Sequence, residues 1–272
     1  MSGSINGSMQ CRPYDSGVGE PVMREVPVET PVAIETNGIA YAVMMATPID
    51  IEDFVTGFLL AEGLAEVEEI GDVVVHQVDS AEWGLGLVAR VTLPLHRLEA
   101  IHARARRRLG DSSCGICGIE SVEAALRPLA PLPAGGMVAA PAIRKGLDGL
   151  RAGQRLGRIT AATHAAAFCS LDGEVIVVRE DVGRHNALDK VIGALARSGA
   201  DPAQGFLVVT SRCSYELVEK AARAGCPLLV AISAPTDLAV RRARAAGLTL
   251  AVVARDDTML WIAPEREVNH GL

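Results

Sequence analysis

The sequence is poor in aromatic residues and contains no long apolar run. Aromatic residues occupy 3% of its 272 positions, although hydrophobic residues together occupy 49%. We therefore expect a substantial core built from Val, Leu, Ile and Ala. No apolar stretch reaches the length of a membrane-spanning helix, and the N-terminus lacks the apolar segment of a signal peptide. These absences argue against a membrane partner, and we expect a cytoplasmic protein.

An excess of positive charge is also missing. The 26 Lys and Arg residues are outnumbered by 33 Asp and Glu residues, giving a net charge of −7, which argues against general nucleic-acid binding. The six cysteines lack the regular spacing of a secreted disulfide framework. The chain contains neither a Gly-x-Gly-x-x-Gly motif that opens a helix after a strand nor a P-loop. A nucleotide ligand would have to be bound in another way.

The stretch from Ser112 to Gly118 contains Cys114 and Cys117, whose thiols are the most reactive groups that the sequence predicts. Small residues surround both cysteines, and residues 119–126 are predicted to form a helix directly behind them. The unpaired N–H groups at a helix N-terminus lower the pKa of a nearby thiol. Positive charge has the same effect, and the preceding arginines are Arg104, Arg106, Arg107 and Arg108. Because a thiolate attacks and accepts other sulfur atoms, we predict that both cysteines are catalytic.

A Cys-x-x-Cys pair can also bind zinc or form a redox disulfide, and the sequence weakens both roles but leaves them open. A closed zinc site needs four ligands, and no second Cys-x-x-Cys or His-x-x-x-His is present, so we predict no metal site. The remaining cysteines are scattered singly at Cys11, Cys169, Cys213 and Cys226. A thioredoxin-like pair follows a strand near the start of a βαβ unit, whereas a polar, basic segment precedes this one.

The first half of the chain predicts a small α+β domain over residues 21–110. It follows a Gly- and Ser-rich tail, residues 1–20, that we expect to be disordered. Asn37-Gly38 lies between two apolar stretches and predicts a hairpin. Strands are also predicted at 73–78 and 85–93, and helices at 51–64 and 95–109. Residues 111–141 contain the two cysteines and then many Pro and Gly residues, which indicate a loop and linker.

Residues 142–272 predict an α/β domain. Strands are expected at 165–171, 174–179, 206–210, 228–232, 248–254 and 258–262, with Asp172-Gly173 as the hairpin turn between the first two. Helices are expected at 143–153, 186–197, 215–224 and 235–246. Strands that alternate with helices over short connections predict a mainly parallel or mixed sheet covered by helices on both faces.

Polar residues cluster where four of these predicted strands end. Ligands of open α/β sheets bind at the carboxyl ends of the strands, helix N-termini attract phosphate, and arginine binds anions in a bidentate manner. We therefore predict an anionic, nucleotide-bearing cofactor at this edge. The candidate residues are Asp181, Arg184, His185, Ser211, Arg212 and Thr236. Any single cluster could equally be ordinary helix capping, since Asp and Thr are good N-cap residues.

Four motifs together resemble those of the FdhD-type sulfur carrier proteins, which are needed for formate dehydrogenase activity. They are Ser113-Cys114-Gly115-Ile116-Cys117-Gly118, Thr163-His164-Ala165-Ala166-Ala167, Glu180-Asp181-Val182-Gly183-Arg184-His185-Asn186-Ala187-Leu188-Asp189-Lys190 and Ser211-Arg212-Cys213-Ser214-Tyr215-Glu216. The resemblance covers about residues 22–264, and the third motif is long and highly specific.

The resemblance implies a sulfurtransferase with a cytidine deaminase-like core that forms a homodimer. Its other partners would be a cysteine desulfurase, which donates persulfide sulfur to Cys114 with support from Cys117, and the catalytic subunit of formate dehydrogenase. The cargo and sulfur acceptor would be molybdenum bis(molybdopterin guanine dinucleotide) or its tungsten counterpart. The matching cofactor-binding stretch consists of Val253, Ala254, Arg255, Asp256, Asp257 and Thr258.

Two positions depart from the family pattern. Asp256 and Asp257 follow Arg255 where the family often has a glycine, and two carboxylates are unfavourable beside a phosphate. Cys213 is unusual at its position and is either a buried small apolar residue or an additional thiol.

Three other functions remain open. A zinc deaminase uses His-x-Glu followed by Pro-Cys-x-x-Cys, but here Cys114 precedes His164 and no glutamate follows that histidine. A non-catalytic chaperone would only bind the cofactor or the dehydrogenase, and a redox dithiol would cycle a disulfide between the paired cysteines. Replacing Cys114 separates a carrier, which would lose its function, from a pure chaperone.

Overall fold

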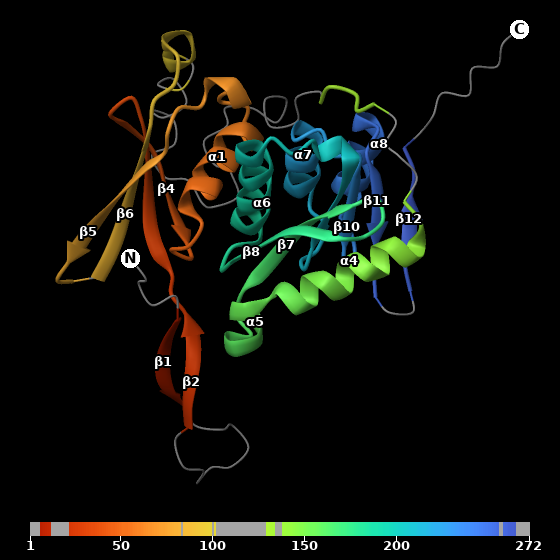
Figure 1. Cartoon of the computed structure of the whole chain (residues 1–272), viewed down its shortest axis with the longest axis horizontal. Coiled ribbons are helices and arrows are strands. Elements are labelled where there is room, and N and C mark those ends of the chain that lie inside the picture. Colours follow the sequence, from red (N-terminus) through yellow and green to blue (C-terminus); the bar gives the residue numbers. More distant parts are fainter. Residues whose placement is uncertain are drawn as a thin grey trace, which may run out of the picture.

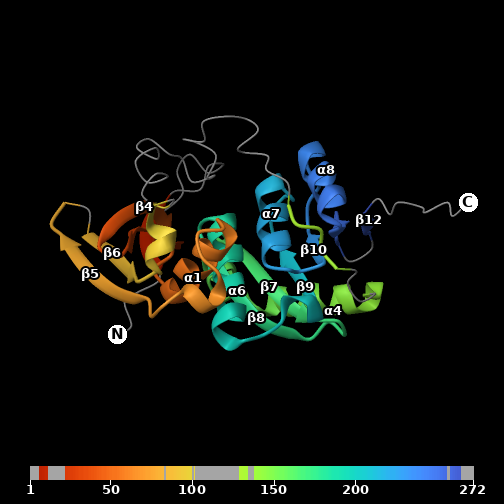
Figure 2. The same cartoon turned by 90° about the horizontal axis from the view of Figure 1, so that it is seen from above.

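The structure is a computed structural model that describes residues 6–11, 22–82, 84–99, 101, 129–133, 138–255 and 258–264. A four-stranded sheet comes from the first half of the chain and a six-stranded sheet from the second half. Two helices, α1 (Ile51–Ala61) and α6 (Arg184–Ser198), lie between the sheets (Figure 1, Figure 2). The two halves therefore meet along a helix pair.

The smaller sheet is built around the predicted hairpin. β3 (Thr30–Thr36) and β4 (Ile39–Ala46) pair antiparallel, and Asn37 and Gly38 join them with φ angles of 50° and 81°. β6 (Gly84–Val91) lies parallel to β3, and β5 (Val74–Ser80) pairs antiparallel with β6. The short 3-10 helix η1 (Val67–Glu69) connects α1 to β5. These elements confirm the α+β character predicted for this part of the chain.

A two-stranded antiparallel hairpin projects from the smaller sheet (Figure 1). It consists of β1 (Asn6–Cys11) and β2 (Val22–Pro27). The prediction of a disordered tail over residues 1–20 is therefore wrong for Asn6–Cys11, because β2 supplies these residues with a strand partner. The rest of that tail lies outside the described residues.

The larger sheet is mixed and has the order β12-β11-β10-β9-β7-β8. Its strands are β7 (His164–Ser170), β8 (Val175–Asp181), β9 (Gly205–Val209), β10 (Leu228–Ala231), β11 (Thr249–Val252) and β12 (Leu260–Ile262). β9, β10 and β11 are parallel, whereas β7 pairs antiparallel with both β8 and β9, and β12 pairs antiparallel with β11. The predicted α/β class, with a mainly parallel or mixed sheet, is confirmed in its mixed form.

Helices cover both faces of the larger sheet, as predicted. α4 (Ala140–Gly153) lies on one face, and α7 (Tyr215–Arg223) and α8 (Asp237–Ala246) lie on the other face with α6 (Figure 2). Ala167 and Val208 belong to the core beneath α4, whereas Ala166 and Leu207 belong to the core beneath α6, α7 and α8. Because both faces are buried, these strands are continuously apolar in sequence. The 3-10 helix η2 (Pro202–Gln204) leads into β9.

α1 and α6 approach each other unusually closely at two glycines. A Cβ atom at Gly57 of α1 would lie 1.8 Å from the carbonyl oxygen of Asp189, and one at Gly193 of α6 would lie 1.9 Å from the carbonyl oxygen of Asp53. The opposite side of α1 packs Phe54 against the smaller sheet, so the helix is buried on two sides.

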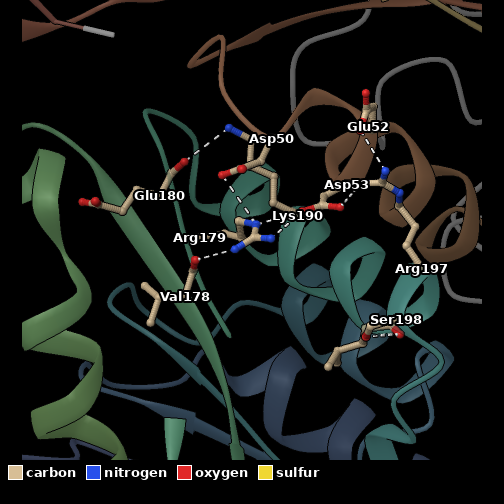
Figure 3. A network of polar contacts seen from close by, with 10 residues as sticks. Asp50, Glu52, Asp53, Val178, Arg179, Glu180, Lys190, Arg197 and Ser198 are labelled. Carbon is tan, nitrogen blue, oxygen red and sulfur yellow. Dashed lines mark hydrogen bonds and ion pairs between the residues drawn. The ribbon is translucent and has the colours of Figure 1, made fainter. Parts of the chain in front are cut away.

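Charged side chains also link α1 to α6 and to β8 (Figure 3). Asp53 of α1 accepts hydrogen bonds from Arg179 Nε and Nη2 at 2.9 and 2.7 Å, and it also pairs with Arg197 of α6. Glu52 binds Arg197 at 2.8 Å, and Asp50 lies 3.5 Å from Arg179. One carboxylate on α1 thus binds an arginine from β8 and another from α6.

The sequence prediction and the structure differ in one helix of the second half and agree over the described part of one helix of the first half. The helix α5 (Arg155–Thr160) was not predicted. The predicted helix 95–109 is described only to residue 101, and residues 95–99 and 101 are helical. Among the helices that the structure describes, none combines the length and the apolar character needed to cross a membrane.

Candidate functional site

The four polar strand ends lie at one edge of the larger sheet. β9, β10 and β11 run in the same direction. β8 also runs in this direction, because it is antiparallel to β7, which is itself antiparallel to β9. The end of β8 at Asp181 is paired with His164, where β7 starts. The predicted common edge is therefore present, with the start of β7 between the ends of β8 and β9.

Asp181, predicted to bind a cofactor, is fully engaged in contacts within the protein. Its carboxylate accepts hydrogen bonds from the backbone N–H groups of Thr47 at 3.0 Å and Gly183 at 2.8 Å, and from Asn186 Nδ2 at 2.9 Å. Lys190 Nζ lies 2.7 Å from the same carboxylate, and both side chains are completely buried. Asp181 therefore fixes the start of α6 and ties it to the first half of the chain.

Two other polar residues at this edge have structural contacts. Thr236 caps α8, because its hydroxyl accepts a hydrogen bond from Ala239 N at 3.2 Å. Glu180 accepts hydrogen bonds from the backbone N–H groups of Leu156 and Gly157 at 2.8 and 2.7 Å, which holds the first turn of α5. For Thr236, helix capping accounts for the contact that the structure shows.

His185, Ser214 and Glu216 form a buried polar cluster where α6 and α7 begin. His185 Nε2 lies 4.0 Å from Glu216 Oε2. Within the described part of the chain, neither of these atoms nor Ser214 Oγ has a hydrogen-bond partner. Burial lowers the pKa of His185 to about 3, and the positive charges of Arg184 and Lys220 act in the same direction. The imidazole is therefore neutral at neutral pH, and the cluster has unused donors and acceptors.

Positive groups surround this cluster. Arg184 is close enough to lower the pKa values of both His164 and His185, although burial is the larger cause for each. Arg212 and Arg255 are exposed at the same edge of the sheet. Ser211 is buried, and its hydroxyl donates to the carbonyl oxygen of Arg212 at 3.0 Å. Of the predicted residues, Arg184 and His185 thus open α6, and Ser211 and Arg212 follow β9 at the same edge.

Val253, Ala254 and Arg255 follow β11 directly. Val253 has a φ of 52°, which is unusual for a β-branched residue and indicates a constrained backbone. Ala254 is buried and its N–H donates to the carbonyl oxygen of Ala231 at 3.1 Å, while Arg255 N donates to Thr258 O at 2.9 Å. Asp256 and Asp257 lie outside the described residues.

Cys114 and Cys117 also lie outside the described residues, so their predicted reactivity stays a prediction. Cys169, Cys213 and Cys226 are completely buried, and burial raises the pKa of each thiol to about 12. At neutral pH these three thiols are protonated. Cys213 therefore packs as a small apolar residue, which is one of the two roles that the sequence left open for it.

The sequence prediction missed Ser214 and Glu216 as site residues. Ser214 occupies the N-cap position of α7, and Glu216 lies in its first turn. Both residue types are common there, because they favour a helix start. What distinguishes them is that their buried oxygen atoms lack partners among the described residues, which only a three-dimensional structure reveals.

The fold defines an α/β protein that has polar residues at the carboxyl ends of its strands. The fold matches that of a protein from Desulfotalea psychrophila whose crystal structure was solved as a formate dehydrogenase accessory protein. The match has a TM-score of 0.74 and 24% identity, and it covers 95% of this chain and 97% of that chain.

The family model described as the FdhD/NarQ family matches residues 27–268, and the chain belongs to this family. A protein from Variovorax paradoxus (strain S110), named sulfur carrier protein FdhD, is 46% identical over 242 residues, which are 89% of this chain and 86% of that protein. A protein of the same name from Xanthomonas campestris pv. campestris (strain B100) is 48% identical over 256 residues, 94% of this chain and 90% of that protein. The resemblance seen in the motifs is confirmed.

Proposed function

We propose that this protein is a sulfur carrier that serves formate dehydrogenase. The observation that carries the proposal is the identity of 46% and 48%, over nearly the whole chain, to proteins named as sulfur carriers. Cys114 and Cys117 supply the thiol chemistry that such a role requires. The name of the Desulfotalea psychrophila protein supports the dehydrogenase as the enzyme served.

The cargo in this proposal is molybdenum bis(molybdopterin guanine dinucleotide), bound at the polar edge of the larger sheet. α6 and α7 begin there, and helix N-termini attract phosphate groups. Arg184 and Arg212 add positive charge, and the cluster of His185, Ser214 and Glu216 provides unused hydrogen-bonding groups. The proposed site leaves out Asp181 and Thr236, because the carboxylate of Asp181 is bound within the protein and the Thr236 hydroxyl accepts a hydrogen bond from Ala239 N. The stretch from Val253 to Thr258 that the resemblance implies is part of the proposed site.

Sulfur enters by thiol exchange from a cysteine desulfurase. The Cys114 thiolate attacks the outer sulfur of the donor persulfide, the S–S bond of the donor breaks, and the donor cysteine leaves as a thiolate. Onward delivery as hydrosulfide requires two electrons. Cys117 supplies them: its sulfur attacks the inner sulfur of the Cys114 persulfide, and the outer sulfur leaves with the Cys117 proton. The resulting Cys114–Cys117 disulfide is reopened by a cellular thiol reductant.

Intact mass spectrometry tests the carrier role. The purified protein is incubated with a cysteine desulfurase and cysteine, and its mass is measured before and after mild reduction. We expect a reductant-sensitive gain of one sulfur atom, about 32 Da, that is absent in Cys114→Ala. If the protein gains no sulfur while guanosine diphosphate still binds, a chaperone role replaces the carrier role.

A further inference from the structure

A hollow lies at the edge of the larger sheet opposite the polar strand ends. α7 leaves the end of β9 and returns to the start of β10, so its own end is at this second edge. The hollow has a volume of about 480 Å³, within the range of about 300–1,000 Å³ that is typical of ligand sites. The ends of α1, α6 and α7 surround it together with η1. Its apolar lining includes Leu60, Val67, Leu129, Ile192 and Ala196.

The rim of this hollow is negative. Three helices end there, and the negative end of a helix dipole attracts positive charge. Glu66 and Glu68 of the η1 region also border the hollow. Glu68 is exposed and has no ion-pair partner among the described residues, whereas Glu66 lies 3.5 Å from Arg97. Arg223 is the one basic residue among the described lining residues, and it lies 3.6 Å from Glu219, which also pairs with Arg242.

The first residues that the structure describes after the two cysteines lie at this hollow. Leu129 and Ala130, the first described residues after Cys117, belong to the lining. Leu132 is then fixed at the end of α8, because its N–H donates to the carbonyl oxygen of Ala246 at 2.8 Å. A protein docked in the hollow would therefore stand beside one attachment point of the cysteine segment.

We propose that this hollow is the docking site for the persulfide donor protein. The donor inserts an apolar side chain between Leu60, Val67 and Ile192, and a Lys or Arg of the same donor segment lies against Glu68 and the helix ends. This inference rests on the proposed sulfur-carrier function, because it names the surface on which the donor binds before sulfur reaches Cys114.

Two variants test the docking site, one by changing a charge and the other by filling the hollow. Glu68→Lys reverses an exposed charge at the rim, and Ala196→Phe fills the hollow from α6. The matched controls are Glu82→Lys, at the exposed turn between β5 and β6, and Ala152→Phe on the exposed side of α4. Persulfide formation is followed by intact mass at several concentrations of carrier, with either cysteine desulfurase plus cysteine or inorganic polysulfide as the sulfur source.

We expect Glu68→Lys to raise the KM for loading from the desulfurase about threefold or more, with kcat unchanged, because reversal of a rim charge weakens encounter. Ala196→Phe should raise this KM as well. Polysulfide needs no docking, so it should load all variants equally. Both controls should match the wild type.

Two results would overturn the docking site. One is that Glu68→Lys and Ala196→Phe load from the desulfurase with the wild-type KM. The other is that both variants convert an oligomer to a monomer without changing the loading, which would assign the hollow to a second copy of this chain. Failure of the carrier function itself looks different, because then even the wild type gains no sulfur from the desulfurase.

Discussion

Asp181 and Lys190 form a completely buried ion pair between β8 and α6. Removing one charge of such a pair leaves the other uncompensated, at a cost of about 3–5 kcal/mol. We therefore predict that Asp181→Asn lowers the free energy of unfolding by about this amount, measured by urea denaturation. The folded fraction should keep its affinity for guanosine diphosphate, measured by calorimetry.

Arg212 is exposed, so we expect its replacement to affect nucleotide binding and not stability. Arg212→Ala should change the free energy of unfolding by no more than about 0.5 kcal/mol, and it should weaken binding of guanosine diphosphate. If Asp181→Asn instead abolished nucleotide binding without loss of stability, the structural role given to Asp181 would be wrong.

His185 makes the stability of the protein depend on pH. Burial lowers the pKa of its folded form from 6.5 to about 3. Below pH 6.5 the unfolded chain therefore binds a proton that the folded protein excludes, so the free energy of unfolding decreases as the pH falls toward about 3. The slope should reach at most about 1.4 kcal/mol per pH unit, measured by urea denaturation at a series of pH values.

The charges around His185 are Arg184, Lys220 and His164, which oppose its protonation, and Glu216, which favours it. His185→Gln should flatten the pH dependence between pH 6.5 and 3. His76→Gln, a change at an exposed histidine, should leave it as in the wild type. An unchanged slope in His185→Gln would show that other groups cause the pH dependence.

At the scale of elements, the crossing of α1 and α6 leaves no room for a side chain at either of its two glycines. Gly57→Ala or Gly193→Ala would place a methyl group within 2 Å of a backbone carbonyl oxygen, so the helices must separate. Overpacking typically costs about 1–3 kcal/mol, and we expect a loss at or above the upper end of this range in urea denaturation. Gly86→Ala is the control, because its nearest new contact is an ordinary 3.5 Å. Equal effects at Gly57 and Gly86 would contradict the close approach of the two helices.

The sequence predicted those turns and helices that depend on residues close together in the chain. Asn37 and Gly38 both adopt positive φ angles, which these residue types tolerate, and the helical spacing of Phe54 and Phe58 marks α1. α5 was not predicted, because its six residues lack apolar periodicity and Glu180, which holds its first turn, is more than twenty positions away.

For the candidate site, the sequence could predict which strand ends lie at the shared edge, but not which residues there bind a ligand. A shared edge follows from alternating strands and helices, and the structure has it. Whether a polar residue at that edge binds a ligand or the protein depends on distant residues: Asp181 is bound by Thr47, 134 positions earlier in the chain. Since no local pattern encodes that contact, sequence analysis assigned Asp181 to the cofactor.

At the scale of the whole molecule, α1 makes the two halves interdependent. One of its sides belongs to the core of the smaller sheet, and another packs on α6 with Asp53 bound to Arg179 and Arg197. If either half unfolded alone, a large apolar side of α1 or α6 would be exposed to water. We therefore predict one cooperative unfolding transition for the regions that the sequence divided into residues 21–110 and 142–272.

Hydrogen exchange followed by mass spectrometry in increasing urea measures this cooperativity. Peptides from β3 and β4 should lose protection at the same urea concentration as peptides from β9 and β10. Asp53→Asn leaves Arg179 and Arg197 without their shared carboxylate, and it should lower the free energy of unfolding by about 2–4 kcal/mol, shifting both sets of peptides together. If the β3 and β4 peptides open first, and only they respond to Asp53→Asn, the halves are separate folding units and the helix pair is merely their point of contact.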